Sequence, residues 1–335
     1  MNRAAGGGIG ADEAPYSYDG EEFRKPRILV VGCGEAGSRM VRRLEKVGPS
    51  GADLLEVWDS RRGRGPGGGD GSAGGVGPRT DEGKADLVEA LQGADLVFVL
   101  GGLGEGMKPE GAAPAVCEMA GRLGRTAVAI FTVRPESRED EEGLRPGGAL
   151  SGGLAEAADT VILLDGGRVL EAAPGLSAEE ASSVMDQVVA EILRGIVETV
   201  QETSLINLDY AGLKNVVGSG GLASALVGES GCEDGPEAAV RSALRNPMLE
   251  ADLQRAKGCI LTITGGRDLT LRKAAAIASA LKGVLGPEAE LVWGARLKEG
   301  HEGKVGLLAT IVGVELPTDI RESGTGRGVM AARRD

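Results

Sequence analysis

The chain has 335 residues, enough for about two domains of ordinary size. Its 37 Lys and Arg against 50 Asp and Glu give a net charge of −13, which disfavours nucleic acid as a partner. The 2 Trp, 3 Tyr and 3 Phe offer no stacking platform for single strands, and one histidine, His301, excludes multi-histidine metal sites. Glycine is abundant, 57 of 335 residues, which favours loops that bind phosphate through backbone N–H groups.

The cysteines and the apolar runs indicate the compartment. Cys33, Cys117, Cys232 and Cys259 lie far apart without a C-x-x-C pair, which is typical of reduced, buried thiols. The N-terminus has no apolar signal-peptide core, and no run approaches the roughly 18 apolar residues of a spanning helix. We therefore expect a cytoplasmic protein without a membrane span.

The first half of the chain predicts a parallel sheet with helices on both faces. Residues 1–26 are polar and are expected to be a disordered tail. Continuous apolar runs then alternate with helical segments, the pattern of strands buried on both faces. The predicted strands are 27–31, 53–58, 94–100, 126–133 and 161–164, and the predicted helices are 38–47, 84–92 and 112–123. We expect a nucleotide-binding type of domain over 27–176.

A long helix follows. Ser177 and Glu180 have the S-x-x-E spacing of a capping box, and apolar residues then recur every fourth position from Val184 to Val200. The pattern predicts a helix of about 25 residues, some 37 Å long, and we assign 177–206 to this central helix.

The second half predicts a smaller α/β domain over 207–316, before a disordered tail over 317–335. Its predicted strands are 259–264, 291–297 and 305–315, and its predicted helices are near 236–244 and 270–284. The fold class is therefore α/β, with a parallel-sheet domain, a long central helix and a smaller C-terminal domain.

Glycine loops carry the strongest functional signal. Gly32, Gly34 and Gly37 form a G-x-G-x-x-G between a strand and a helix, as in a phosphate-binding turn. One alternative is a nicotinamide dinucleotide site with Asp59 on the ribose, and another is a turn that merely requires glycine. Two more glycine loops, at 73–75 and 101–106, favour a nucleoside triphosphate held by several backbone nests.

The order of these motifs resembles the tubulin/FtsZ family, and most closely archaeal-type FtsZ. The likeness runs from about residue 27 to residue 316. The segments that carry it are VVGCGEAGSRMV (30–41), SAGGVG (72–77), GADLVFVLGGLGEG (93–106), GAAPAV (111–116), SLINLDYAGLKNVV (204–217), TITGGRDLTL (262–271) and AELVWGARL (289–297).

This resemblance implies GTP or GDP as ligand, with Mg²⁺ as a candidate companion ion, and head-to-tail filaments. The family hydrolyses GTP when the acidic loop of the next subunit reaches the γ-phosphate, a role that falls on Asn207 and Asp209. The implied nucleotide-binding residues are Gly32, Cys33, Gly34, Glu35, Ala36, Gly37, Ser38, Arg39, Gly74, Gly75, Gly104, Glu105, Gly106, Met107, Lys108, Glu139 and Asp186. Of these, Glu139 falls at the ribose position and Asp186 at the guanine edge.

The sequence departs from the family where the chemistry occurs. The signature loop lacks both threonines, and Glu105 and Glu110 bring negative charge toward a triphosphate. The asparagine that normally closes the first loop is Arg39, a candidate phosphate cation. The second acid of the trans-acting loop is Gly212, and the purine-stacking aromatic is Ser182.

Two principal hypotheses follow. One is a divergent, structural FtsZ-like protein that binds GTP weakly or not at all and has weak or lost GTPase activity. It would assemble with or regulate an FtsZ-type filament in cell division or shape, with itself or an FtsZ paralogue as partner. The other is an active GTPase whose filaments turn over. Membrane-tethering or division proteins are candidate further partners. A weaker alternative is a dinucleotide oxidoreductase, which the expected absence of a second Rossmann half and the intact 262–271 segment oppose.

Simpler roles compete with several assignments. Asn207 and Asp209 are residue types that cap turns with their own side chains. Glu139 opens an acidic run, 139–142, that suits a solvated helix start. The four cysteines suit core packing, although Cys33 is also expected to face a ligand bound at the first glycine loop.

Overall fold

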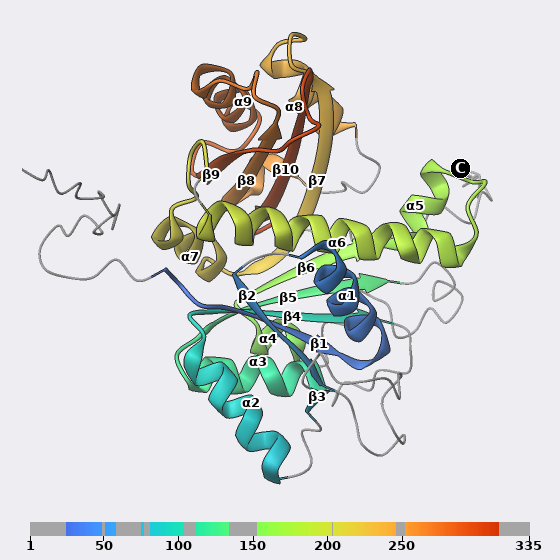
Figure 1. Cartoon of the computed structure of the whole chain (residues 1–335), viewed down its shortest axis with the longest axis vertical. Coiled ribbons are helices and arrows are strands. Elements are labelled where there is room, and N and C mark those ends of the chain that lie inside the picture. Colours follow the sequence, from blue (N-terminus) through green and yellow to red (C-terminus); the bar gives the residue numbers. More distant parts are fainter. Residues whose placement is uncertain are drawn as a thin grey trace, which may run out of the picture.

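One ten-stranded sheet runs through both halves of the molecule (Figure 1). The computed structural model describes residues 25–48, 51–57, 75–76, 81–103, 112–133, 153–202, 204–245 and 252–314. The strand order is β3-β2-β1-β4-β5-β6-β7-β10-β8-β9. The strands are β1 (Ile28–Cys33), β2 (Ala52–Val57), β3 (Gly75–Val76), β4 (Leu96–Leu103), β5 (Thr126–Val133), β6 (Thr160–Asp165), β7 (Gly221–Gly231), β8 (Gly258–Gly265), β9 (Glu290–Leu297) and β10 (Lys304–Val312).

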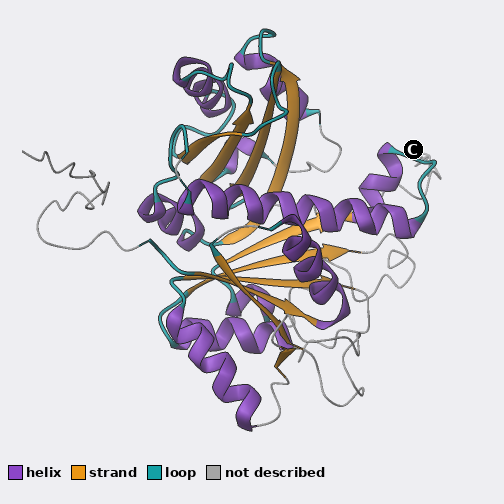
Figure 2. Cartoon of the chain, viewed as in Figure 1, coloured by secondary structure: helices purple, strands orange, loops and turns teal. Residues whose placement is uncertain are grey.

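The helices lie in layers against this sheet (Figure 2). They are α1 (Gly34–Val47), α2 (Asp81–Gly93), α3 (Ala112–Arg122), α4 (Leu154–Ala157), α5 (Gly166–Ala172), α6 (Ala178–Gln201), α7 (Tyr210–Gly218), α8 (Pro236–Leu244) and α9 (Leu271–Lys282), with a 3-10 turn at Leu253–Arg255. Helices α1 and α6 share one apolar core with one face of strands β1, β4, β5 and β6. Helices α2 and α3 share a second core with the opposite face.

Strands β1 to β6 are all parallel to their neighbours, so their carboxyl ends meet at one edge of the sheet. Strands β4 and β5 are buried along their whole lengths, which explains their continuous apolar sequences. The predicted α/β class, with a parallel sheet covered on both faces, is confirmed.

Helix α6 lies between the two halves of the molecule (Figure 1). It begins with the predicted capping box, in which the Ser177 hydroxyl accepts from the Glu180 N–H and the Glu180 carboxylate accepts from the Ser177 N–H. Its 24 residues span about 36 Å, and it contacts α1 on one side and β8 and β9 on the other. The long helix is confirmed, although it ends at Gln201.

The second half contains a strand that the sequence does not reveal. Strand β7 (GLASALVGESG) pairs with β6 through Gly221–Ala223 and then with β10 along its length. Its small residues have low strand propensity, but they allow α8 to approach closely. A Cβ at Gly228 would lie only 2.5 Å from the backbone nitrogen of Ala243 on α8. Tertiary packing therefore determines this strand.

The segment 204–217, which contains the predicted acidic loop, is a loop only in its first part. Residues from Tyr210 onward form α7, whose N-terminus is capped by the Asp209 carboxylate. Leu213, Val216 and Val217 of this helix are buried in the core shared with α6. The segment is too short to show a clear helical period, so its helix was not visible in the sequence.

Gly294→Ala should destabilise the contact between α6 and the second half. A Cβ at Gly294 would collide with Cγ2 of Thr199 on α6, so we expect a loss of about 1–3 kcal/mol in unfolding free energy from overpacking. Urea unfolding followed by circular dichroism measures it.

The matched control is Gly121→Ala on α3, where an added Cβ meets nothing within 4 Å. That substitution should raise stability by about 0.5–1 kcal/mol because alanine favours helix. Equal midpoints for the two variants would contradict the packing assignment.

Candidate functional site

The carboxyl edge of the parallel strands contains a topological switch point between β1 and β4. From β1 the chain order proceeds outward in both directions, to β2 on one side and β4 on the other. Crevices outside such a point are where open α/β sheets bind ligands. Helix α1 begins directly after β1 at this edge, so its first N–H groups point into the same region.

The glycines of this turn permit close contact between backbone segments. A Cβ at Gly32 would lie 2.5 Å from the carbonyl oxygen of Gly37, and a Cβ at Gly37 would collide with the carbonyl oxygen of Leu100 on β4. Gly34 has φ +70°, a conformation that glycine adopts without strain. Each glycine therefore has a packing or backbone reason, which a phosphate-binding turn and a plain strand–helix turn share.

The side chains around the turn differ in exposure. Gly34 and Glu35 are exposed, while Ala36 and Ser38 are buried. Ala36 packs against β4, and a Cβ added at Gly102 of β4 would lie 2.7 Å from the Cβ of Ala36. Within the described part of the chain, the buried Ser38 hydroxyl has no hydrogen-bond partner. An unsatisfied buried hydroxyl of this kind marks a place where a ligand oxygen could bind.

Cys33 does not face the turn with its side chain. The residue is 2% exposed and packs with Val31, Leu55 and Val57 in the core on the α2 and α3 side of the sheet. The expectation that its thiol faces a ligand is therefore wrong. Only the backbone of Cys33 remains available to a ligand.

Two predicted ligand residues meet each other across α1 and α6. The Arg39 Nε lies 3.3 Å from Asp186 Oδ2, and Asp186 is only 6% exposed. One turn further along α1, Arg43 donates to Gln187 Oε1 at 2.8 Å and to Ser183 Oγ at 3.3 Å. The ion pair therefore belongs to a polar seam that joins the helix after the glycine turn to the central helix.

Several predicted site residues lie outside the described residues. They are Gly74, Gly104, Glu105, Gly106, Met107, Lys108 and Glu139, together with Asp59 of the dinucleotide alternative. Gly75 belongs to the short strand β3, paired with Glu56 of β2. The structure thus brings together the first glycine turn, Ser38, Arg39 and Asp186, and their roles toward a nucleotide stay predictions.

Asn207 and Asp209 lie at the opposite, amino edge of the parallel strands. Their neighbour Tyr210 lies near Asp95, which directly precedes β4, and this proximity places the loop at the amino edge. Burial, and after it the charge of Asp95, raises the pKa of Tyr210. Asn207 Oδ1 accepts from the Ser204 N–H at 3.0 Å, and its Nδ2 donates to the Glu202 carbonyl at 3.2 Å. These residues cannot reach the glycine turn of their own chain, so any action on a ligand there must be on a second molecule.

The Asp209 carboxylate caps α7. Its two oxygens accept from the N–H groups of Ala211 at 3.2 Å and Gly212 at 3.0 Å. A carboxylate has further lone pairs, so these bonds leave capacity to accept from water. The simpler capping role is thus present in the structure, and it does not exclude a role toward a neighbour.

Gly212 occupies the position of the missing second acid, and the position has little room. A Cβ there would lie 2.9 Å from Val292 Cγ2 on β9 and 3.0 Å from Asp209 Oδ2. An aspartate at this position would also place a second carboxylate beside Asp209. The loss of the acid is therefore accompanied by packing that closes its place.

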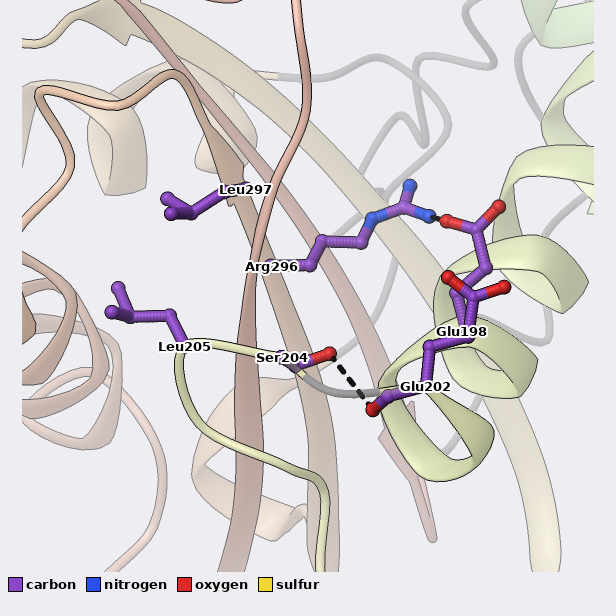
Figure 3. A pocket seen from close by; sticks show the side chains of 6 residues that line it. All are labelled: Glu198, Glu202, Ser204, Leu205, Arg296 and Leu297. Atoms are coloured by element: carbon purple, nitrogen blue, oxygen red, sulfur yellow. Dashed lines mark hydrogen bonds and ion pairs between the residues drawn. The ribbon is translucent and has the colours of Figure 1, made fainter. Parts of the chain in front are cut away.

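A cavity of about 280 Å³ lies between the C-terminal turns of α6 and strand β9 (Figure 3). It is lined by Glu198, Glu202, Ser204, Leu205, Arg296 and Leu297. In Figure 3 the Arg296 side chain extends from β9 to the Glu198 carboxylate of α6, with which it forms an ion pair. The cavity is remote from the glycine turn, at the other end of the central helix.

Arg296 belongs to a charge network that the sequence did not reveal. Its Nε donates to Thr264 Oγ1 at 2.9 Å, and Arg194 forms ion pairs with Glu191 at 3.3 Å and with Glu198 at 3.4 Å. Burial, followed by the charge of Arg194, lowers the pKa of Arg296 to about 10, so it remains cationic at neutral pH. Arg296 is itself buried on β9, and a buried charged residue indicates a partner that the sequence alone does not identify. The network therefore joins α6 to strands β8 and β9 of the second half.

Neither a metal-ligand cluster nor a membrane-spanning helix occurs among the described residues. In the described ranges, no three His, Cys, Asp or Glu side chains form a group that could hold a metal ion. Among the described helices, none is both long and apolar enough to cross a bilayer.

Comparisons with known proteins place the chain in a family. The model of the FtsZ family C-terminal domain matches residues 221–315. Cell division protein FtsZ 2 of Halobacterium salinarum is 38% identical over 316 residues, covering 88% of this chain and 78% of that protein. FtsZ 2 of Methanocaldococcus jannaschii is 36% identical over 328 residues, covering 90% of this chain and 83% of that protein. A solved empty FtsZ dimer from M. jannaschii superposes with a TM-score of 0.74 at 30% identity, covering 87% of this chain and 89% of the chain in that structure.

These matches first define the class, a protein with the tubulin/FtsZ fold. The chain belongs to the FtsZ family, and its named relatives are archaeal. The resemblance inferred from the motifs is therefore confirmed.

Gly212→Asp should destabilise the protein by about 1–3 kcal/mol, because the added atoms press on Val292 and face the Asp209 carboxylate. Adding Val292→Ala should relieve the steric part, leaving the charge part. Gly218→Ala, at the last residue of α7 with nothing within 4 Å, is the control that should not lower the urea midpoint. A fully stable single Gly212→Asp variant would contradict the assigned packing.

The four cysteines should be unreactive in the folded protein. All four are buried, and burial raises the thiol pKa of each one, that of Cys117 to about 12. The reactive thiolate is therefore scarce at pH 8, and it becomes available only when unfolding restores an ordinary pKa. We expect negligible reaction with Ellman's reagent at pH 8 and four thiols per chain in denaturant. Rapid labelling of any cysteine without denaturant would contradict this.

Proposed function

We propose that this chain is an FtsZ-type cytoskeletal protein that binds guanine nucleotide at the β1–α1 turn and assembles head-to-tail in cell division or cell shape. The partner in the filament is a second copy of the chain or an FtsZ paralogue. GTP hydrolysis is weak or lost. The observation that carries the proposal is the separation of the glycine turn and the Asn207–Asp209 loop to opposite edges of one sheet.

The geometry supports binding in several ways. The turn lies at the switch point of the parallel sheet, α1 directs its N-terminal N–H groups toward the same region, and the Ser38 hydroxyl is buried without a partner in the described chain. The named relatives are cell division proteins, and one related structure is a dimer. Mg²⁺ would accompany the phosphates as a companion of the ligand, since the described residues contain no ready set of metal ligands.

The proposal of weak hydrolysis rests on the trans-acting loop. Gly212 stands where the family has a second acid, and Val292 and Asp209 fill the space that a side chain would need. Asn207 and Asp209 both make local hydrogen bonds. The altered signature loop, with Glu105 and Glu110, acts on the same step. An active GTPase whose filaments turn over is the second candidate, and the presence of Asn207 and Asp209 favours it.

The topology removes one argument against a dinucleotide enzyme. Strands β3-β2-β1-β4-β5-β6 are parallel and follow the order 3-2-1-4-5-6 of a complete Rossmann sheet, so the expected absence of a second half is wrong. What opposes the oxidoreductase is the family membership and the second half of the molecule, which matches the FtsZ C-terminal domain over residues 221–315.

Nucleotide content and turnover test the proposal. The full chain, freshly purified, is extracted with acid and its nucleotides are separated by ion-exchange chromatography, and phosphate release from added GTP is followed over a range of protein concentrations. We expect guanine nucleotide, whether retained or rebound on addition, and turnover far below that of an active FtsZ. Gly212→Asp alone should not restore turnover.

Each other outcome is informative. Turnover at the rate of an active FtsZ would replace weak hydrolysis by the second candidate. NAD in the extract would support the oxidoreductase. Failure to bind any guanine nucleotide, with no filaments by electron microscopy alone or with an FtsZ paralogue, would overturn the proposal.

A further inference from the structure

The ion pair between Arg39 and Asp186 sits at a meeting point of two site elements. Arg39 lies two residues after Gly37, in the second turn of α1, and Asp186 lies in the third turn of α6. The pair has an N–O distance of 3.3 Å, and the Arg39 side chain is 33% exposed while that of Asp186 is 9% exposed. One member is thus partly open to solvent and the other is enclosed.

A buried carboxylate needs a cationic partner to remain ionised, because burial removes the water that would otherwise solvate it. Arg39 supplies that charge at ion-pair distance. An arginine is always protonated, so the partnership does not vary in the neutral pH range. The neighbouring Arg43 bonds only the neutral groups of Gln187 and Ser183 in the described contacts, and these already join α1 to α6.

We propose that Arg39 is a positioning residue that selects guanine by holding Asp186 as an oriented carboxylate at the base edge. This inference rests on the proposed function, in which Asp186 faces the base. It adds a role for a residue that replaces the expected asparagine, and it differs from a role for Arg39 as a phosphate cation.

The selection follows from hydrogen-bond chemistry. Guanine presents two donors on one edge, its N1–H and its exocyclic amine, and an ionised carboxylate is a pure acceptor that matches both. Hypoxanthine keeps the N1–H and lacks the amine, so it loses one bond. Adenine presents an acceptor at N1, which a carboxylate repels. Without Arg39 the Asp186 carboxylate loses the charge that orients it toward the base edge, and it no longer distinguishes these bases in the same way.

The test compares dissociation constants of GTP, ITP and ATP for the full-length chain by calorimetry. The variants are Arg39→Ala, Arg39→Lys and Asp186→Asn, with Arg43→Ala as the matched control one turn along α1. We expect wild type to prefer GTP over ITP by about tenfold or more, the scale of one hydrogen bond to a charged group. Arg39→Ala and Asp186→Asn should both remove most of this preference. Arg39→Lys should keep part of it, and Arg43→Ala should keep all of it.

The double variant Arg39→Ala/Asp186→Asn separates the roles of Arg39. If Arg39 acts through Asp186, the double variant should bind GTP, ITP and ATP as tightly as Asp186→Asn alone does, whereas a phosphate contact would make the double variant weaker toward all three. If Arg39 instead contacts phosphate, Arg39→Ala should weaken GTP, ITP and ATP by the same factor and leave the ratio unchanged, which overturns the inference. The same result would follow from a purely structural pair.

The two levels of failure are distinguishable. Wild type that binds guanine nucleotide, with a GTP-to-ITP ratio unaffected by Arg39→Ala, overturns this inference and leaves the proposed function standing. Wild type that binds no guanine nucleotide overturns the proposed function, and the inference with it.

Discussion

The candidate site depends on the contact between the β1–α1 turn and the end of β4, where backbone meets backbone. Gly37 leaves no room for a Cβ against the carbonyl oxygen of Leu100 on β4, and Gly32 leaves none against the backbone of Gly37. Their contact fixes where α1 starts relative to the sheet edge and therefore where its unpaired N–H groups point. It also brings the second turn of α1 against α6, which allows Arg39 to reach Asp186. A side chain at either glycine would shift all of these features together.

Much of the first half could be predicted from the sequence. The runs that become β1, β4 and β5 are apolar because both faces of these strands are buried, and such runs are visible without a structure. The capping box of α6 is likewise local, since Ser177 and Glu180 satisfy each other. Strand β7 was missed because its small residues, which let α8 pack closely against it, do not form an apolar pattern typical of a strand. Helix α7 was missed because it is short.

The site was less predictable than the fold, because roles depend on contacts between distant segments. The thiol of Cys33 points into a core that only the side-chain alternation of β1 determines. The pairing of Arg39 with Asp186 joins residues 147 positions apart. The Arg296 and Glu198 pair is separated by 98 positions, and no local pattern announces it. Motifs can indicate which loops approach one edge, but they do not determine which charges neutralise one another.

The local hydrogen bonds of the segment between α6 and α7 have a consequence for association. Asn207 is held by the backbone of Ser204 and Glu202, Asp209 is held by the first turn of α7, and Ile206 forms a bridge to Ala295 of β9. Most of the entropy lost in fixing this segment has therefore been spent in folding the single chain. A molecule that docks against it meets a surface already in its final shape, so little ordering cost is added on docking and the encounter resembles the fitting of two rigid bodies.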